Sequence, residues 1–127
     1  MRRTTACLLF AKTSTTDLST NTRSFSRSPS LRYVDGARID QPPISPVFGD
    51  LSNLPPTLIQ VSRDELVFGD AVRYSNKAAA AGSPIELQVW PKLVHVFQLF
   101  GPDLLEATDA LELAAEFIRA QVKSERR

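Results

Sequence analysis

Cysteine is almost absent from this sequence, since Cys7 is the only one among 127 residues. One thiol alone forms neither an intrachain disulfide nor a cysteine-based metal site, so a reducing interior compartment is the default expectation. Long hydrophobic runs are absent too: no stretch approaches the roughly 18 apolar residues that a membrane-spanning helix needs. We therefore expect no membrane span and no secretion signal, and take the cytoplasm as the expected location.

Glycine is scarce and unsuitably spaced for one common kind of catalytic site. The five glycines stand at positions 36, 49, 69, 82 and 101, so no two are four apart and none are adjacent. A serine nucleophile elbow needs the GxSxG spacing, and the usual oxyanion loop needs consecutive glycines. Neither motif exists in this sequence. His95 is the only histidine, which also excludes a helical His-x-x-x-His metal pair, and we expect no cofactor.

Charge is unevenly distributed along the chain. The net charge of +1 gives no general attraction to nucleic acid. Residues 1–38 contain seven Arg or Lys and two Asp, whereas residues 39–127 contain eight Arg or Lys and twelve acids. We predict that 1–38 is a basic, Ser/Thr-rich and mostly irregular segment with a possible strand near 6–10. A mitochondrial targeting segment is the alternative interpretation of the same composition.

Proline, glycine and apolar patterns predict one α/β domain over residues 39–123, and residues 124–127 should form a short tail. Prolines exclude helix from 41 to 56, where we expect a packed connecting loop. Residues 57–61 form a β-favouring run, and residues 85–90 alternate as a half-buried strand does. Between them we predict a helix over about 71–81, capped by Asp70 and ended by Gly82.

A strand, a helix and a second strand in this order form a βαβ unit, which requires parallel pairing. The fold class is therefore α/β. Asp103 and Glu106 have capping-box spacing and predict the start of a last helix, which packs on the sheet and ends near Lys123. Its expected buried stripe has spacings of three and four: Leu104, Thr108, Leu111, Ala115, Ile118 and Val122.

Chemistry-bearing residues follow both strands. Asp64 and Glu65 lie in the loop over 62–69, and His95 lies in the loop over 91–102. Loops that follow parallel strands emerge at the same sheet edge, so these side chains should converge. A carboxylate that orients an imidazole forms two thirds of a relay that activates a nucleophile. On the residues alone, His95 as a packing residue and the two acids as a solvated turn remain open alternatives.

These segments resemble the fold-3 α/β-hydrolases related to hormone-sensitive lipase and bacterial carboxylesterases. The similar segments are residues 43–51 (PISPVFGDL), 54–59 (LPPTLI), 64–66 (DEL) with Asp70, 89–91 (VWP) and 95–97 (HVF), and more weakly 16–18 (TDL). The resemblance implies the carboxyl-terminal portion of an α/β-hydrolase fold that acts on small carboxylic esters. Ser62 and Lys92 depart from the family, which usually has glycine at both positions.

The resemblance also implies roles for the site residues. It makes His95 the general base and then the general acid, and it favours Glu65, thirty positions earlier, as the acid that orients it. Asp64 is the second candidate for that acid. Because the elbow and the oxyanion loop are missing, we expect a fragment with an incomplete triad that is inactive alone.

The alternative to a hydrolase is a non-catalytic binding or dimerisation module derived from the same fold. An exposed sheet edge would then serve a homodimer or a complementing partner, since an unpaired edge invites pairing. The candidate contact residues are apolar and lie on or near the second strand: Leu87, Val89, Phe97 and Phe100.

Overall fold

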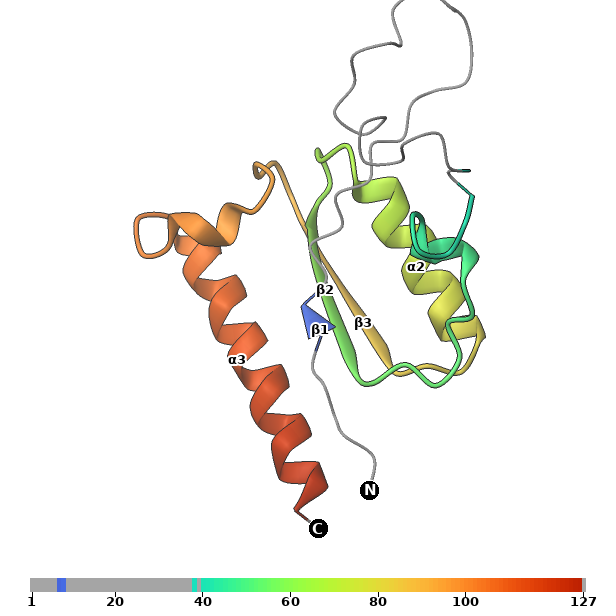
Figure 1. The fold of residues 1–127 in the computed structure, drawn as a ribbon. Helices are drawn as coiled ribbons and strands as arrows, with labels where there is room; N and C mark the ends of the chain where they lie inside the picture. The colour runs from blue at the N-terminus through green and yellow to red at the C-terminus, as the bar shows by residue number, and fades with distance from the viewer. Residues whose placement is uncertain (1–6, 9–37, 39, 127) are drawn as a thin grey trace, which may run out of the picture.

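The computed structural model describes residues 7–8, 38 and 40–126, and they form a parallel sheet between two helices (Figure 1). The strands are β1 (Cys7–Leu8), β2 (Thr57–Ser62) and β3 (Ile85–Trp90), and the helices are α2 (Phe68–Ala80) and α3 (Leu105–Glu125). The sheet has the order β1-β2-β3, and both pairings are parallel. The predicted βαβ unit and the α/β class are confirmed. Apart from β1, the basic segment 1–38 lies almost wholly outside the described residues.

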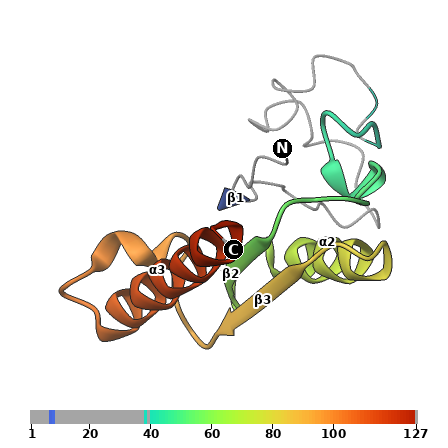
Figure 2. The ribbon, with the colours of Figure 1, turned by 90° about the horizontal axis from the view of Figure 1, so that it is seen from below.

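The two helices cover opposite faces of β2 and β3 (Figure 2). Alternation along β2 divides its side chains between these faces. Ile59 and Val61 pack with Ala71 of α2, while Gln60 donates a hydrogen bond to the Ala110 carbonyl of α3. Five of the six residues of β2 are buried, so β2 is the central strand on which both layers rest.

Helix α2 begins earlier than expected, and its predicted cap is wrong. The N-cap is Val67 and the first helical residue is Phe68, so Asp70 lies in the first turn and forms an ion pair with Arg73. A carboxylate there still interacts favourably with the positive end of the helix dipole. The predicted end is confirmed: Gly82 has a φ of +80°, and the Gly82 and Ser83 amides bond to the carbonyls of Ala79 and Ala78. This is the Schellman arrangement.

Helix α3 lies on the sheet, but through a different stripe from the predicted one. Its fully buried residues are Ala107, Ala110 and Ala114, whereas the expected Leu111, Ile118 and Val122 are 48%, 40% and 45% exposed. Alanines let the helix approach the bulky Phe97 and Trp90 closely, so the larger side chains turn to the flank.

The two ends of α3 also differ from prediction. The N-cap is Leu104 and has no side-chain cap bond, so the capping box predicted from Asp103 and Glu106 is not formed. The helix continues to Glu125, two residues past the expected end at Lys123. No helix within the described ranges is both long enough and apolar enough to cross a membrane.

The proline-rich loop before β2 is only partly buried, with Leu51 its one buried residue, and it is not wholly free of helix. A short 3-10 helix, η2 (Pro46–Phe48), starts on Pro46, whose fixed φ suits the first helical position. Lys77 of α2 donates to the carbonyls of Val47 and Gly49 at 2.8 and 2.9 Å. These bonds tie the loop to α2.

Candidate active site

The loops after β2 and β3 meet at one edge of the sheet, where Figure 1 shows both at the top. The first loop begins bonded to the end of β3, since the Arg63 amide donates to the Trp90 carbonyl at 2.8 Å. This bond extends the β2–β3 pairing beyond the last strand residues, Ser62 and Trp90. The predicted convergence of the two loops is therefore present in the structure.

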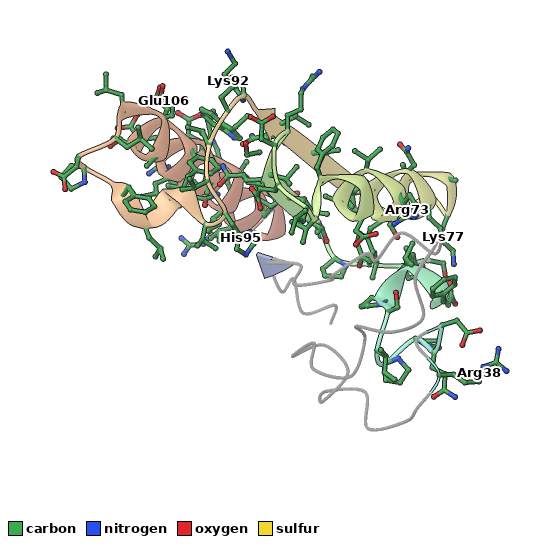
Figure 3. The ribbon with its side chains drawn as sticks, turned by 90° about the horizontal axis from the view of Figure 1, so that it is seen from above. Arg38, Arg73, Lys77, Lys92, His95 and Glu106 are labelled. Atoms are coloured by element: carbon green, nitrogen blue, oxygen red, sulfur yellow. The ribbon has the colours of Figure 1, made fainter. Side chains whose placement is uncertain are left out.

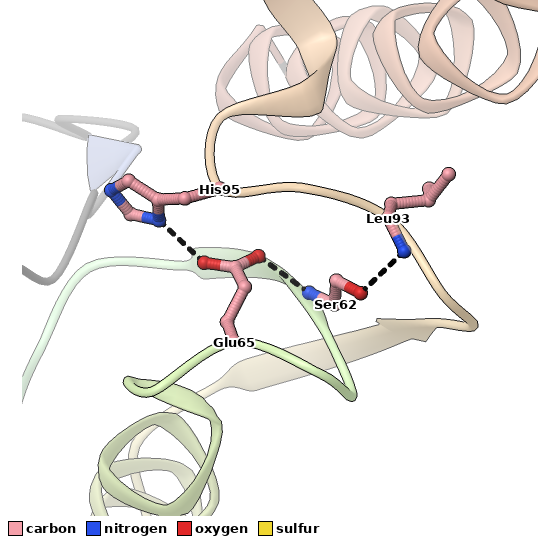
Figure 4. A network of polar contacts seen from close by, with 4 residues as sticks. All are labelled: Ser62, Glu65, Leu93 and His95. Atoms are coloured by element: carbon pink, nitrogen blue, oxygen red, sulfur yellow. Dashed lines mark hydrogen bonds and ion pairs between the residues drawn. The ribbon is translucent and has the colours of Figure 1, made fainter.

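Glu65 and His95 are in direct contact across these loops (Figure 4). Oε2 of Glu65 lies 2.5 Å from Nδ1 of His95, and Oε1 of the same carboxylate accepts a 2.7 Å hydrogen bond from the Ser62 amide. The Glu65 side chain is only 7% exposed, whereas that of His95 is 49% exposed. Both carboxylate oxygens are thus used, and a nearly buried acid holds a ring that is open to solvent on its other side.

The geometry of this pair determines what the imidazole is able to do. When Nδ1 carries a proton and donates it to Glu65, the lone pair of the neutral ring is on Nε2. Figure 4 shows the second ring nitrogen pointing away from Glu65. An Nε2 in that position is able to take a proton from a hydroxyl group, while the carboxylate stabilises the imidazolium that results.

Asp64, the second acid candidate, does not share this contact. Its side chain is exposed, and the hydrogen bond and ion pair of His95 run to Glu65. Adjacent residues in a turn point in different directions, so only one of the two acids is able to face the ring. The structure brings Glu65 and His95 together and leaves Asp64 in solvent.

Ser62 connects the two loops, a role that the sequence did not reveal. It is fully buried at the end of β2, and its Oγ accepts a 2.9 Å hydrogen bond from the Leu93 amide (Figure 4). Sequence comparison marks Ser62 only as a departure from glycine, and the bond depends on the path of a loop some thirty residues away. A small polar residue at the carboxyl end of a buried strand was the one available signal.

The loop that carries His95 has an unusual backbone. Lys92 and Val96 have φ values of +52° and +54°, in the left-handed region that favours glycine. Figure 3 shows the Lys92 and His95 side chains on opposite sides of this loop. Lys92, which stands where the family usually has glycine, thus keeps a backbone conformation that favours glycine, and its side chain lies away from the imidazole.

The loop that bears His95 rests on a hydrophobic cluster around Phe97. Phe97, which is 1% exposed, contacts Trp90 with ring centroids 5.5 Å apart and packs with Ala107 and Ala110. Phe97 begins the short 3-10 helix η3 (Phe97–Phe100), so its burial fixes the end of the loop that bears His95. As a candidate contact residue Phe97 is wrong, because it belongs to the core.

Three glutamines form hydrogen bonds that connect η3, the sheet and α3. Gln60 of β2 donates to Gln88 of β3 at 2.9 Å and to the Ala110 carbonyl at 2.7 Å, and it accepts from Gln98 of η3 at 3.1 Å.

Within the part of the chain that the structure describes, no group of three or more His, Cys, Asp or Glu residues is placed to hold a metal ion.

Comparison with known proteins identifies the family to which this fold belongs. A family model described as alpha/beta hydrolase fold matches residues 9–99. An acetyl-hydrolase of Streptomyces hygroscopicus is 40% identical over 88 residues, which are 69% of this chain and 29% of that protein. The chain therefore spans less than a third of this relative's length.

Solved structures agree with the sequence comparison. The esterase EstE5, in a crystal soaked with p-nitrophenyl butyrate, is 40% identical with a TM-score of 0.69 and matches 72% of this chain and 31% of its own. An esterase of the bacterial hormone-sensitive lipase family is 38% identical with a TM-score of 0.70, again over 72% and 31% of the two chains. The described fold is thus one part of a larger hydrolase fold.

Proposed function

Since the chain belongs to the alpha/beta hydrolase fold family of esterases and lipases related to hormone-sensitive lipase, we propose that Glu65 and His95 are the acid and the base of a Ser-His-acid site for small carboxylic esters. The observation that carries this proposal is the contact between Oε2 of Glu65 and Nδ1 of His95. It gives the imidazole the orientation that proton transfer requires.

In this mechanism Nε2 of His95 removes the proton of a serine hydroxyl as its oxygen attacks the ester carbonyl carbon. The same proton then passes from Nε2 to the alcohol that leaves, and an acyl-serine remains. Water repeats the sequence: Nε2 takes a proton from it, and the serine receives that proton when the acid product leaves. Glu65 stays ionised throughout and stabilises the imidazolium.

The 127 residues supply only this proton-transfer half of the site. They contain neither a GxSxG elbow nor a pair of adjacent glycines, so the sequence has no recognisable nucleophile or oxyanion hole. Oxyanion stabilisation is often the largest single contribution to acyl-transfer catalysis. We therefore propose that these residues alone do not hydrolyse esters and that activity requires a nucleophile-bearing segment.

A hybrid enzyme tests this proposal directly. Residues 38–126 replace the matching segment of the acetyl-hydrolase of Streptomyces hygroscopicus, which supplies the remainder of the domain. Hydrolysis of p-nitrophenyl butyrate by the hybrid, and its loss when His95 is replaced by alanine, would support the assigned roles. A folded hybrid whose hydrolysis does not depend on His95 would refute them. The 127-residue chain assayed alone should match buffer.

A second candidate function is self-association through β3. Among the described strands, β3 pairs only with β2, which leaves its other edge without a strand partner. Val89 on β3 and Phe100 after it are 40% and 51% exposed. An apolar, unpaired edge of this kind favours pairing with a second copy. Light scattering coupled to size exclusion should give a dimer mass that Val89→Lys reduces to a monomer; a monomer mass for the unaltered chain would exclude this function.

A further inference from the structure

Ser62 is hydrogen-bonded both to Glu65 and to the loop that carries His95. Its amide donates to Oε1 of Glu65 at 2.7 Å, and its hydroxyl oxygen accepts from the Leu93 amide at 2.9 Å (Figure 4). The residue is 0% exposed, so water does not compete for either bond. A single buried side chain thereby joins the loop of the acid to the loop of the histidine.

The loop that Ser62 holds is in a conformation that its own sequence disfavours. Lys92 has a φ of +52°, where the Cβ of any residue other than glycine is crowded. Val96, immediately after His95, has a φ of +54°, which is rarer still for a β-branched residue. Such conformations persist only where surrounding contacts impose them.

Two hydrogen bonds flank the left-handed turn at Lys92. Before the turn, the Trp90 carbonyl accepts from the Arg63 amide at 2.8 Å; after it, the Leu93 amide donates to Ser62. The first bond joins backbone to backbone and would form with any residue at 63 other than proline. The second depends on a side-chain oxygen at position 62. Of the two bonds, only the one to Ser62 therefore depends on which side chain stands in the sequence.

We propose that Ser62 is a positioning residue: its hydroxyl holds the strained turn at Lys92 so that Nδ1 of His95 meets Oε2 of Glu65. Its effect on ester hydrolysis rests on the function proposed above, but its effect on the loop does not. Serine at 62 and lysine at 92 then form a coupled pair, since a glycine at 92 would need no such support.

The test measures the loop itself by NMR on the full chain. Ser62→Ala removes the hydroxyl and should speed hydrogen exchange of the Leu93 amide about five- to tenfold, the value of one hydrogen bond. It should also weaken the Nδ1–H proton signal of His95 that the bond to Glu65 protects from exchange. Unchanged exchange at Leu93 together with an unchanged His95 signal would overturn the proposal.

Ser83→Ala is the matched control. Ser83 is 6% exposed, and its hydroxyl also accepts a backbone hydrogen bond, from the Leu54 amide at 3.0 Å, at the opposite end of the sheet. This substitution removes the same group at similar burial, so it should leave the Leu93 and His95 signals as they are. Equal changes in those signals with Ser83→Ala would show a general loss of stability and overturn a specific role for Ser62.

Lys92→Gly added to Ser62→Ala keeps the proposal testable even if Ser62→Ala prevents folding. Glycine accepts the left-handed turn without strain, so the double variant should recover the His95 signal. Failure to recover it, in a folded or an unfolded double variant, would overturn the coupling. Ester hydrolysis by the hybrid with and without His95 remains a separate measurement, so failure of the proposed function would not be confused with failure of this inference.

Discussion

Glu65 and His95 lie thirty residues apart in the chain, yet Oε2 of the first is 2.5 Å from Nδ1 of the second. The contact arises from topology, because each residue follows one of two paired parallel strands. The Ser62 amide on Oε1 and the hydrogen bond on Oε2 leave the carboxylate little freedom to rotate. The relationship is therefore built into the sheet edge.

Glu65→Gln should abolish most of the activity of the hybrid enzyme while leaving it folded. An amide at this position favours the wrong imidazole tautomer, and the equivalent change in a serine protease triad reduces kcat by about 10⁴-fold. The rate of p-nitrophenyl butyrate hydrolysis is the measurement. Asp64→Asn is the control, since Asp64 is exposed next to Glu65, and its rate should stay within about threefold of the unaltered hybrid.

Replacement by alanine should change stability with opposite signs at Gly69, in the first turn of α2, and at Gly82, just after its end. Gly82 has a φ of +80°, so Gly82→Ala should lower the free energy of unfolding by about 1 kcal/mol. Gly69 lies inside α2 with no atom within 4 Å of an added Cβ, so Gly69→Ala should raise it by about 0.5–1 kcal/mol. Urea denaturation of both variants measures the difference; changes of the same sign would contradict the backbone argument.

The glutamine network predicts that Gln60→Met is more destabilising than Gln88→Met. Gln60 makes bonds to Gln88, Gln98 and the Ala110 carbonyl, so its loss leaves buried polar groups without partners. Such a loss costs about 1–3 kcal/mol. Gln88 also bonds to the exposed Glu86, and its replacement should cost less. Equal urea midpoints for the two variants would show that the network adds nothing beyond packing.

The packing of α3 makes a prediction that the amphipathic pattern alone would reverse. Ala110 is 0% exposed, so Ala110→Leu should force the helix away from Phe97 and cost about 1–3 kcal/mol. Leu111 is 48% exposed, and Leu111→Ala should change stability by about 1 kcal/mol or less. Thermal denaturation of the two variants measures the difference. A larger loss of stability for Leu111→Ala than for Ala110→Leu would mean that α3 packs through the stripe expected from the sequence.

Much of the fold and the candidate pair were predictable because they depend on local patterns. Apolar runs and the Gly82 stop predicted the two longer strands and the helix between them, and the resemblance to a known family favoured Glu65 over Asp64. The buried face of α3 was not predictable, because Leu111 and Ala110 lie on adjacent stripes with the same helical period. Only the size of Phe97 and Trp90 opposite decides between them.

The link from Ser62 to Leu93 was out of reach of the sequence for a different reason. It depends on a positive φ at Lys92, and the resemblance marks position 92 as usually glycine without telling whether a lysine there keeps the glycine conformation. The predicted starts of the two helices were wrong as well. Val67 and Leu104 cap α2 and α3 without side-chain bonds, so the acidic residues that should mark N-caps pointed to the wrong positions.

The most direct test of the proposed site is the p-nitrophenyl butyrate hydrolysis rate of the hybrid enzyme with His95→Ala, relative to the hybrid with His95 intact. Removal of the base from a triad leaves only the contributions of binding and of the oxyanion hole. The proposed role of His95 as the base predicts a fall of at least about 10³-fold with unchanged folding by circular dichroism. A folded His95→Ala hybrid that keeps a rate within about threefold of its parent would contradict it.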